Sequence, residues 1–241
     1  MANRIKLDNA LKKRQKQKEK KQERKKKISC RILIVCEGEK TEPNYFRNFK
    51  KINNESFTYE IEAKGDGRNT IAVVDEAIRL KLQAESTQTP YDSVWAVFDK
   101  DSFSKNRFNS AIIKANNNGV KVAWSNEAFE LWYLYHFYNR ITAMSRSKYQ
   151  NAISNAVNKA GGLRGKKVYK YAKNAPNNYA IINQYGNQEN AIRWAKEQCQ
   201  TYVDDKYADH NPCTTVYRLV LQLLNRDEDL IKQVMNKINQ K

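Results

Sequence analysis

Cysteine and histidine are scarce in this chain, which has four cysteines and two histidines in 241 residues. None of the cysteines forms a Cys-x-x-Cys pair, and His136 and His210 stand far apart in the sequence. Structural zinc sites use closely spaced ligands of these types, so we do not expect one. Disulfide frameworks are typical of small secreted domains, and this chain is much longer. We therefore expect the four cysteines to be small buried residues.

Long hydrophobic runs are also absent. No segment approaches the roughly 18 consecutive apolar residues that a membrane-spanning helix needs. The N-terminus is rich in lysine and lacks the apolar stretch of a secretory signal peptide. We therefore expect no membrane association and a cytoplasmic location. Hydrophobic residues still make up 40% of the chain, which is enough to build a core.

Acidic residues are outnumbered, because 26 Asp and Glu stand against 44 Lys and Arg, for a net charge of +18. Residues 1–27 hold 13 of these basic residues and only 3 of the acidic ones. A basic chain favours polyanionic partners such as RNA or DNA through counterion release. The segment 1–27 has few large apolar side chains, so we expect a basic, flexible arm. Such an arm is either merely solvated or becomes ordered on nucleic acid.

Short apolar segments alternate with helical patterns over residues 28–140. Their continuous β-branched and aromatic residues are typical of strands that are covered on both faces. This alternation predicts an α/β fold, with a parallel sheet that is flanked by helices and connected by right-handed crossovers. The predicted strands are 31–36, 57–63, 93–98 and 120–124.

Capping signals mark the expected helix ends in this region. Thr41-Glu42-Pro43 predicts a helix start after the first strand, and Asn69 predicts one after the second. Asn118-Gly119 is expected to end the helix that follows the third strand. Ser125-Asn126 predicts the cap of a helix directly after the fourth strand.

Beyond residue 140 the pattern becomes helical and polar. We expect helices near 144–159 and 189–203. Asn211-Pro212 predicts the cap and first residue of a last long helix, since proline suits that position. A homodimer formed through this helical part is compatible with the pattern. The expected organisation is a basic arm (1–27), an α/β domain (28–140) and a helical C-terminal extension (141–241).

Three acidic residues follow two of the predicted strands. Glu37 comes directly after the first strand, and Asp99 and Asp101 come after the third. Sites in open α/β sheets lie beyond the carboxyl ends of strands, and neighbouring strands are about 4.8 Å apart. If these two strands are neighbours, the carboxylates meet and repel one another unless a cation neutralises them. Such oxygen ligands suit Mg²⁺ or Mn²⁺ together with a substrate phosphate.

The acidic pattern also has a purely structural interpretation, because acids after a strand can cap a helix or bond to a turn. Glu130 lies in the apolar helix after the fourth strand, so it is either a further metal ligand or half of a salt bridge. His136 stands six residues later, and we interpret it as a structural histidine.

Several lysines are candidates for nucleic-acid binding. Lys40 follows Glu37 closely, where it either contacts a phosphate or neutralises its acidic neighbours. A second group is interleaved with tyrosines, a pattern that fits phosphate contacts with base stacking and equally fits a solvated surface. This second group is Lys166, Lys167, Lys170 and Lys173.

The order apolar strand, Glu37-Gly38, helix, apolar strand, Asp99-x-Asp101 resembles the Toprim domain. That domain occurs in topoisomerases, DnaG-type primases and overcoming-lysogenization-defect-type nucleases. Further segments resemble the RloB-like family of bacterial phage-defence, or abortive-infection, proteins. They are Ile34-Val-Cys-Glu-Gly-Glu-Lys-Thr-Glu-Pro43, Val97-Phe-Asp-Lys-Asp101, Trp124-Ser-Asn-Glu-Ala-Phe-Glu-Leu-Trp132 and Asn211-Pro-Cys-Thr-Thr215.

The resemblance implies a Toprim fold in which Glu37 is the general acid/base and Asp99 and Asp101 bind Mg²⁺. It further implies a nuclease that acts during phage infection, on tRNA or other RNA, with an ATPase partner. The family pattern often has proline where Glu127 stands, at a predicted helix start.

Two functions remain open from the sequence. The first is a metal-dependent nuclease, that is, a phosphodiester hydrolase. The second is a non-catalytic nucleic-acid-binding or sensor subunit that works with an ATPase partner. A strand-passing topoisomerase would need a separate tyrosine-bearing domain, for which 241 residues leave little room.

Overall fold

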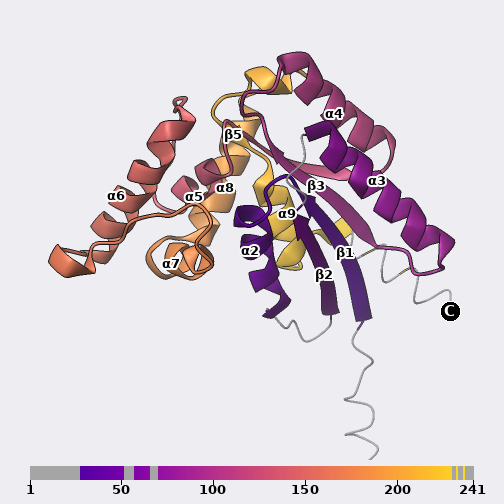
Figure 1. Ribbon diagram of the computed structural model, residues 1–241, viewed down its shortest axis with the longest axis horizontal. Coiled ribbons are helices and arrows are strands. Elements are labelled where there is room, and N and C mark those ends of the chain that lie inside the picture. Colours follow the sequence, from indigo (N-terminus) through magenta and orange to yellow (C-terminus); the bar gives the residue numbers. More distant parts are fainter. Residues whose placement is uncertain (1–27, 52–56, 66–69, 230–231, 233–235, 237–241) are drawn as a thin grey trace, which may run out of the picture.

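A computed structural model of the chain describes residues 28–51, 57–65, 70–229, 232 and 236. The described residues form a five-stranded sheet in the order β2-β1-β3-β4-β5 (Figure 1). Its first four strands in the sequence are parallel and match the four predicted strands. They are β1 (Ile28–Cys36), β2 (Phe57–Gly65), β3 (Ser93–Asp99) and β4 (Lys121–Asn126). The predicted arm (1–27) and the predicted cap Asn69 lie outside the described residues.

The fifth strand lies outside residues 28–140, for which the parallel sheet was predicted, and it adds an antiparallel edge to the sheet. β5 (Cys213–Thr214) pairs with β4 in the antiparallel direction. Asn211-Pro212 therefore precedes a strand. The prediction that these two residues start the last helix is wrong. That helix, α9 (Val216–Leu223), begins only after the strand.

Buried hydroxyl groups explain why this segment is extended. The hydroxyl oxygens of Ser125 and Thr214 are hydrogen-bonded at 2.8 Å across the β4–β5 pair. The backbone N–H of Trp124 donates to Oγ1 of Thr215 at 2.9 Å. These buried groups find their partners on β4, and an unpaired buried polar group would be costly. Tertiary contacts therefore outweigh the local helix-start signal of the proline.

Alternating side chains of the strands supply two hydrophobic cores, one on each face of the sheet. In β1, Ile32 and Ile34 belong to one core, whereas Leu33 and Val35 belong to the other. Helices α3 (Thr70–Ser86) and α4 (Lys105–Asn117) cover the Leu33 face (Figure 1). The helices on the Ile32 side are α2 (Thr41–Arg47), α5 (Glu130–Tyr135), α6 (Tyr149–Gly161), α7 (Asn178–Tyr185), α8 (Gln188–Gln200) and α9. Short 3-10 helices are η1 (Asn48–Lys51), η2 (Arg146–Lys148), η3 (Gly165–Lys167) and η4 (Tyr207–Asp209).

Most predicted helices are present, with one wrong cap. Thr41 starts α2 and Asn118 follows the end of α4, as predicted. The predicted cap Ser125-Asn126 instead lies inside β4, and α5 starts only at Glu130. Asn126 is the last residue of β4, four residues before α5, and its side-chain amide donates to the carbonyl of Ala208 at 3.0 Å. Over the described residues, the structure shows no helix with both the length and the apolar character that a bilayer span requires.

A buried hydrogen bond links the C-terminal helix α9 to the centre of the sheet. The indole Nε1–H of Trp95, in β3, donates to Oε1 of Gln222 at 2.6 Å, and Gln222 is fully buried. Removing the amide leaves the indole donor without its partner in an apolar environment, which costs about 1–3 kcal/mol.

We therefore expect Gln222→Leu to lower the free energy of unfolding by about 1–3 kcal/mol, measured by urea denaturation. The matched control is Gln200→Leu, a substitution at an exposed glutamine near the end of α8. Equal stability of the two variants would contradict a role for this hydrogen bond.

Candidate functional site

Glu37 and Asp99 lie side by side because their strands are neighbours. Cys36, the last residue of β1, pairs with Val97 of β3. The backbone N–H of Glu37 donates to the carbonyl of Val97 at 2.8 Å, which continues the strand pairing. The Glu37 carboxylate then accepts a hydrogen bond from the Asp99 N–H at 3.1 Å. The structure thus brings two of the three predicted carboxylates to one edge of the sheet.

Asp101 lies nearby but is engaged elsewhere. Its backbone has a positive φ of 38°, and its N–H donates to the carbonyl of Glu127 at 3.2 Å. Its carboxylate forms an ion pair with Arg146, which belongs to η2 in the C-terminal extension. The charge of Asp101 still raises the pKa of Glu37, so the two groups are electrostatically coupled. The role of Asp101 as a metal ligand stays a prediction.

Two more carboxylates are buried beside this pair. Glu130, at the start of α5, is 4% exposed, and Glu42, in α2, is 5% exposed. Glu130 accepts a hydrogen bond from the hydroxyl of Tyr171 at 3.1 Å. The Oε2 atoms of Glu42 and Glu130 have no hydrogen-bond partner among the described residues. Glu37, Glu42, Asp99 and Glu130 are hereafter called the carboxylate cluster.

Sequence reasoning missed Glu42, which it interpreted only as an acid at a helix start. Its spacing to Tyr45 and Phe46, three and four residues later, is the signal that could have revealed it. Residues so spaced share one helix face, and both aromatic residues are buried. Gly38 makes room for this carboxylate, because a Cβ at Gly38 would stand 2.1 Å from Oε2 of Glu42.

Burial and the charges of neighbouring carboxylates make Glu37, Glu42 and Asp99 resist ionisation. Burial raises the pKa of the Asp99 carboxyl well above its ordinary value, and the charges of Glu42, Glu130 and Glu37 raise it further. Burial likewise raises the pKa of Glu37 from 4.5 to about 7, which the hydrogen bond from the Asp99 N–H partly opposes. Burial and the charge of Glu130 raise the pKa of Glu42. A proton or a cation is needed to neutralise such a group.

Two cations from the C-terminal extension stand next to the cluster. The positive charges of Lys173 and Arg146 both lower the pKa of Glu42. Lys173 is held near α2 because its carbonyl accepts a hydrogen bond from Oγ1 of Thr41 at 2.7 Å. Together with Tyr171, these residues show that the segment after residue 140 contributes directly to the site.

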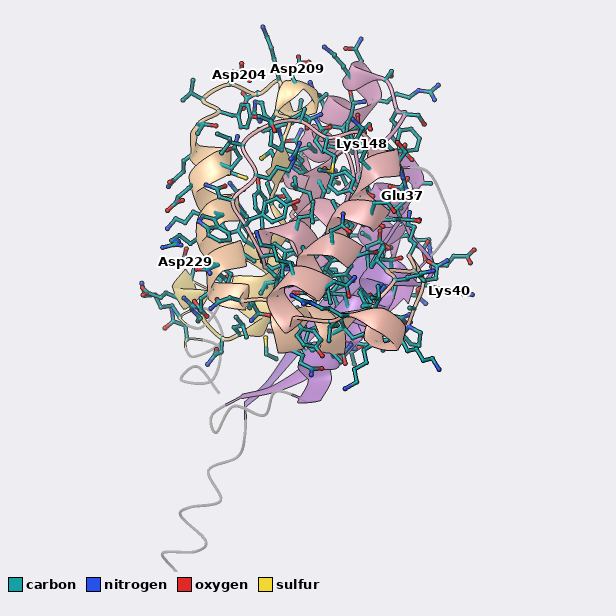
Figure 2. All side chains as sticks on the ribbon, turned by 90° about the vertical axis from the view of Figure 1, so that its left-hand side faces the viewer. Glu37, Lys40, Lys148, Asp204, Asp209 and Asp229 are labelled. Carbon is teal, nitrogen blue, oxygen red and sulfur yellow. The ribbon has the colours of Figure 1, made fainter. Side chains whose placement is uncertain are left out.

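A pocket of about 320 Å³ lies over the start of α2, beside Glu42. Figure 2 shows Glu37 and Lys40 on the same side of the molecule. Of the predicted lysines, Lys40 and Lys173 line this pocket, and Lys40 is exposed. Lys166, Lys167 and Lys170 lie on the exposed surface of η3 and the segment that follows it. The full lining is Gly38, Glu39, Lys40, Thr41, Glu42, Lys173 and Asn174.

The cluster fits a hard divalent cation in its chemistry but not yet in its geometry. Across residues 28–51, 57–65 and 70–229, no three His, Cys, Asp or Glu side chains are positioned to hold a metal ion. The donors are nevertheless carboxylate oxygens, which Mg²⁺ and Mn²⁺ prefer. The buried Oε2 atoms of Glu42 and Glu130 have no hydrogen-bond partner among the described residues, so they are available to bind such an ion. Binding would therefore require the side chains to rearrange.

The raised pKa of Glu37 predicts a pH-dependent stability. The stability that comes from protonated Glu37 is complete below pH 4.5 and is lost as the pH rises through about 7. We therefore expect the Tm in EDTA to fall between about pH 4.5 and about pH 7 and to level off above that range. If a divalent cation takes the place of the lost proton, added Mg²⁺ should raise the Tm more at the higher pH.

The control for this prediction is Glu37→Gln, which keeps the shape of the side chain and cannot ionise. Its Tm should depend less on pH over the same range. Tm values would be measured by calorimetry as a function of pH. Identical profiles of the wild-type chain and the variant would contradict a raised pKa of Glu37.

Comparison with known proteins provides one match. The chain matches the sequence model of a protein family described as RloB-like protein over residues 32–223. This range runs from β1 to the end of α9, so it includes the whole carboxylate cluster. No curated protein and no solved structure matches the chain. Because the match covers most of its length, the chain belongs to the RloB-like protein family.

Proposed function

We propose that this chain is a divalent-metal-dependent nuclease that cleaves nucleic acid in defence against phage. The observation that carries the proposal is the carboxylate cluster at the carboxyl ends of β1 and β3, three of whose four members are buried, with Arg146 and Lys173 beside it. Carboxylates for a metal ion and cations for phosphates are the two elements that phosphodiester hydrolysis requires. The Toprim-like reading of the fold and the role in phage defence rest on the resemblance to the family.

Mg²⁺ or Mn²⁺ would be held by Asp99, Asp101 and Glu130, with Glu37 at its side. When bound, the metal ion supplies Lewis acidity that polarises the phosphate and favours a nucleophilic water. The other buried carboxylate, Glu42, adds negative charge that attracts the cation. Tyr171 keeps Glu130 oriented through its hydrogen bond.

Glu37 would act as the general acid/base. With a pKa of about 7, its protonated and ionised forms are both populated near neutral pH. Proton transfer is most effective when the pKa of the group is close to the working pH. The carboxylate can thus take a proton from the attacking water or give one to the leaving oxygen.

Arg146 would bind the phosphate of the substrate. Its guanidinium is now paired with the carboxylate of Asp101, which occupies the place that a phosphate oxygen could take. An arriving phosphate would compete for Arg146, because guanidinium groups bind phosphates with two parallel hydrogen bonds. This exchange would release Asp101 for the metal ion and so couple substrate binding to metal binding.

The nucleic acid would extend from this point over basic surface. Lys40 and Lys173 line the adjoining pocket, and Lys166, Lys167 and Lys170 are exposed on the same chain segment as Lys173. RNA, including tRNA, is the target that the family resemblance suggests. An ATPase partner remains part of the proposal on the same basis, and a homodimer remains part of it on the helical pattern of residues 141–241.

The Asp101–Arg146 ion pair also favours a second candidate function. If that pair is permanent, Asp101 cannot bind a metal ion, and the chain would be a non-catalytic nucleic-acid-binding or sensor subunit. The two candidates differ in whether Glu37 is needed for protection against phage.

For the nuclease, we expect Glu37→Gln and Asp99→Asn to lower the rate of cleavage by about 10²–10⁴-fold. Cleavage of tRNA and of plasmid DNA would be measured with Mg²⁺, Mn²⁺ or EDTA, with and without the ATPase partner. The control is Asp75→Asn, an exposed acid of α3 that is paired with Lys114 on the other face of the sheet. Full phage protection by Glu37→Ala would favour the sensor subunit and refute catalysis.

If a phosphate displaces Asp101 from Arg146, the substitution Asp101→Asn should have opposite effects on nucleic-acid binding and on cleavage. Asp101→Asn frees Arg146, so nucleic acid should bind more tightly in EDTA, while Mg²⁺-dependent cleavage should fall. Arg146→Met should weaken binding and reduce the salt dependence of log Kd by about one unit of slope. Both are measured by fluorescence anisotropy with a labelled RNA. Unchanged binding by both variants would show that Arg146 does not contact phosphate.

A further inference from the structure

The end of α8 and the edge strand β5 bring two cysteines together. Cys199 is the last residue but one of α8, and Cys213 is the first residue of β5. Their Sγ atoms lie 2.9 Å apart although the residues are 14 positions apart in the sequence. Cys30 and Cys36 are buried, as expected, whereas Cys199 is partly exposed. The sequence gives no sign of this pair because it forms only when β5 joins the sheet.

The thiol pair lines a pocket of about 540 Å³ between the edge of the sheet and α8. Tyr202, His210 and Arg218 line the same pocket, so a small polar molecule can approach the sulfur atoms. Asp204, another lining residue, lies well apart from Glu37 in Figure 2. The pocket is therefore separate from the carboxylate cluster and has no part in the proposed hydrolysis.

The surroundings of Cys199 favour its reactive form. The hydrogen bond between the two sulfur atoms and the positive charge of Arg218 lower the pKa of the Cys199 thiol. The thiolate, not the thiol, attacks disulfides. Cys213 is more buried and stands within reach to attack a bond formed at Cys199. A partly exposed attacking thiol with a buried second thiol is the arrangement that thiol–disulfide exchange uses.

We propose that Cys199 and Cys213 form a reversible disulfide by exchange with a small-molecule disulfide such as oxidised glutathione. The Cys199 thiolate attacks one sulfur of oxidised glutathione, breaks its S–S bond and releases one glutathione. The Cys213 sulfur then attacks Sγ of Cys199 and releases the second glutathione. The two thiol protons pass to the two glutathione molecules, so the chain is oxidised and the small molecule is reduced.

The bond would require little movement and would have a clear structural effect. The sulfur atoms must approach by under about 1 Å to reach the roughly 2.05 Å of a disulfide. The link would close residues 200–212 into a loop and tie α8 to β5. Asn126, opposite Cys213, belongs to the strand that leads to Glu130. Oxidation would thus fix the edge of the sheet without touching the carboxylates.

The test uses the full chain, incubated under native conditions with reduced glutathione alone or with excess oxidised glutathione. Remaining thiols are alkylated, and the denatured chain is digested with trypsin. Cleavage after Lys196, Lys206 and Arg218 separates the two cysteines into peptides 197–206 and 207–218. We expect these two peptides to be disulfide-linked after oxidation and to separate when reduced. Cys30 and Cys36 should stay reduced, so the peptides that carry them should be found alkylated.

Variants distinguish the proposed mechanism from chance oxidation. Cys213→Ala should stop at a glutathione adduct on Cys199, whereas Cys199→Ala should slow the reaction of Cys213 by at least about tenfold. Cys36→Ala is the control and should form the linked peptides like the wild-type chain. Alkylation of both Cys199 and Cys213 after oxidation of the native wild-type chain would overturn the proposal. So would a link between two chains, seen on a non-reducing gel.

Discussion

The burial of several carboxylates at one end of the sheet is the constraint on which the site depends. Burial raises the pKa values of Glu37, Glu42 and Asp99, and the charges of neighbouring carboxylates raise them further. A protein gains no stability from such a cluster, because each charge loses its hydration and meets like charges. The arrangement is reasonable only if another species provides the positive charge. A proton, a metal ion and the cations Arg146 and Lys173 are the species that could do so.

The C-terminal extension is as important to this site as the sheet. It supplies Arg146, Tyr171 and Lys173, and each of them interacts with a carboxylate that the α/β part provides. A site assembled from both parts can respond to a change in either. If a partner protein displaced the segment around Tyr171, Glu130 would lose its hydrogen bond and the local charge balance would shift. Control by a partner is therefore compatible with this architecture.

Much of the fold could be predicted from the sequence because its signals are local. The apolar runs predicted β1 to β4. The positions of Glu37 and Asp99 at the ends of two predicted strands marked them as site residues. The rest depends on contacts between distant residues. The local sequence predicts a helix start at Pro212 because the pairing of β5 with β4 depends on residues far away in the chain, and it predicts a cap at Asn126 for a similar reason.

The site was predictable only in part for the same physical reason. Glu42 looked like an ordinary acid at a helix start until α2 was placed over the sheet and buried it. Asp101 was expected to join the other carboxylates, yet its partner Arg146 stands 45 positions later in the sequence. Charge pairs of this range are set by tertiary structure. The sequence shows which acidic residues lie near a strand end. It does not show which group neutralises each of them.

The position of β5 has a consequence for how the molecule is made. Cys213 and Thr214 complete the edge of the sheet, and the indole of Trp95 has its hydrogen-bond acceptor in Gln222. During synthesis the earlier strands therefore leave the ribosome well before these partners exist. We expect the nascent α/β part to keep an exposed sheet edge until residues 213–222 have been synthesised, and exposed edges of this kind are prone to aggregate.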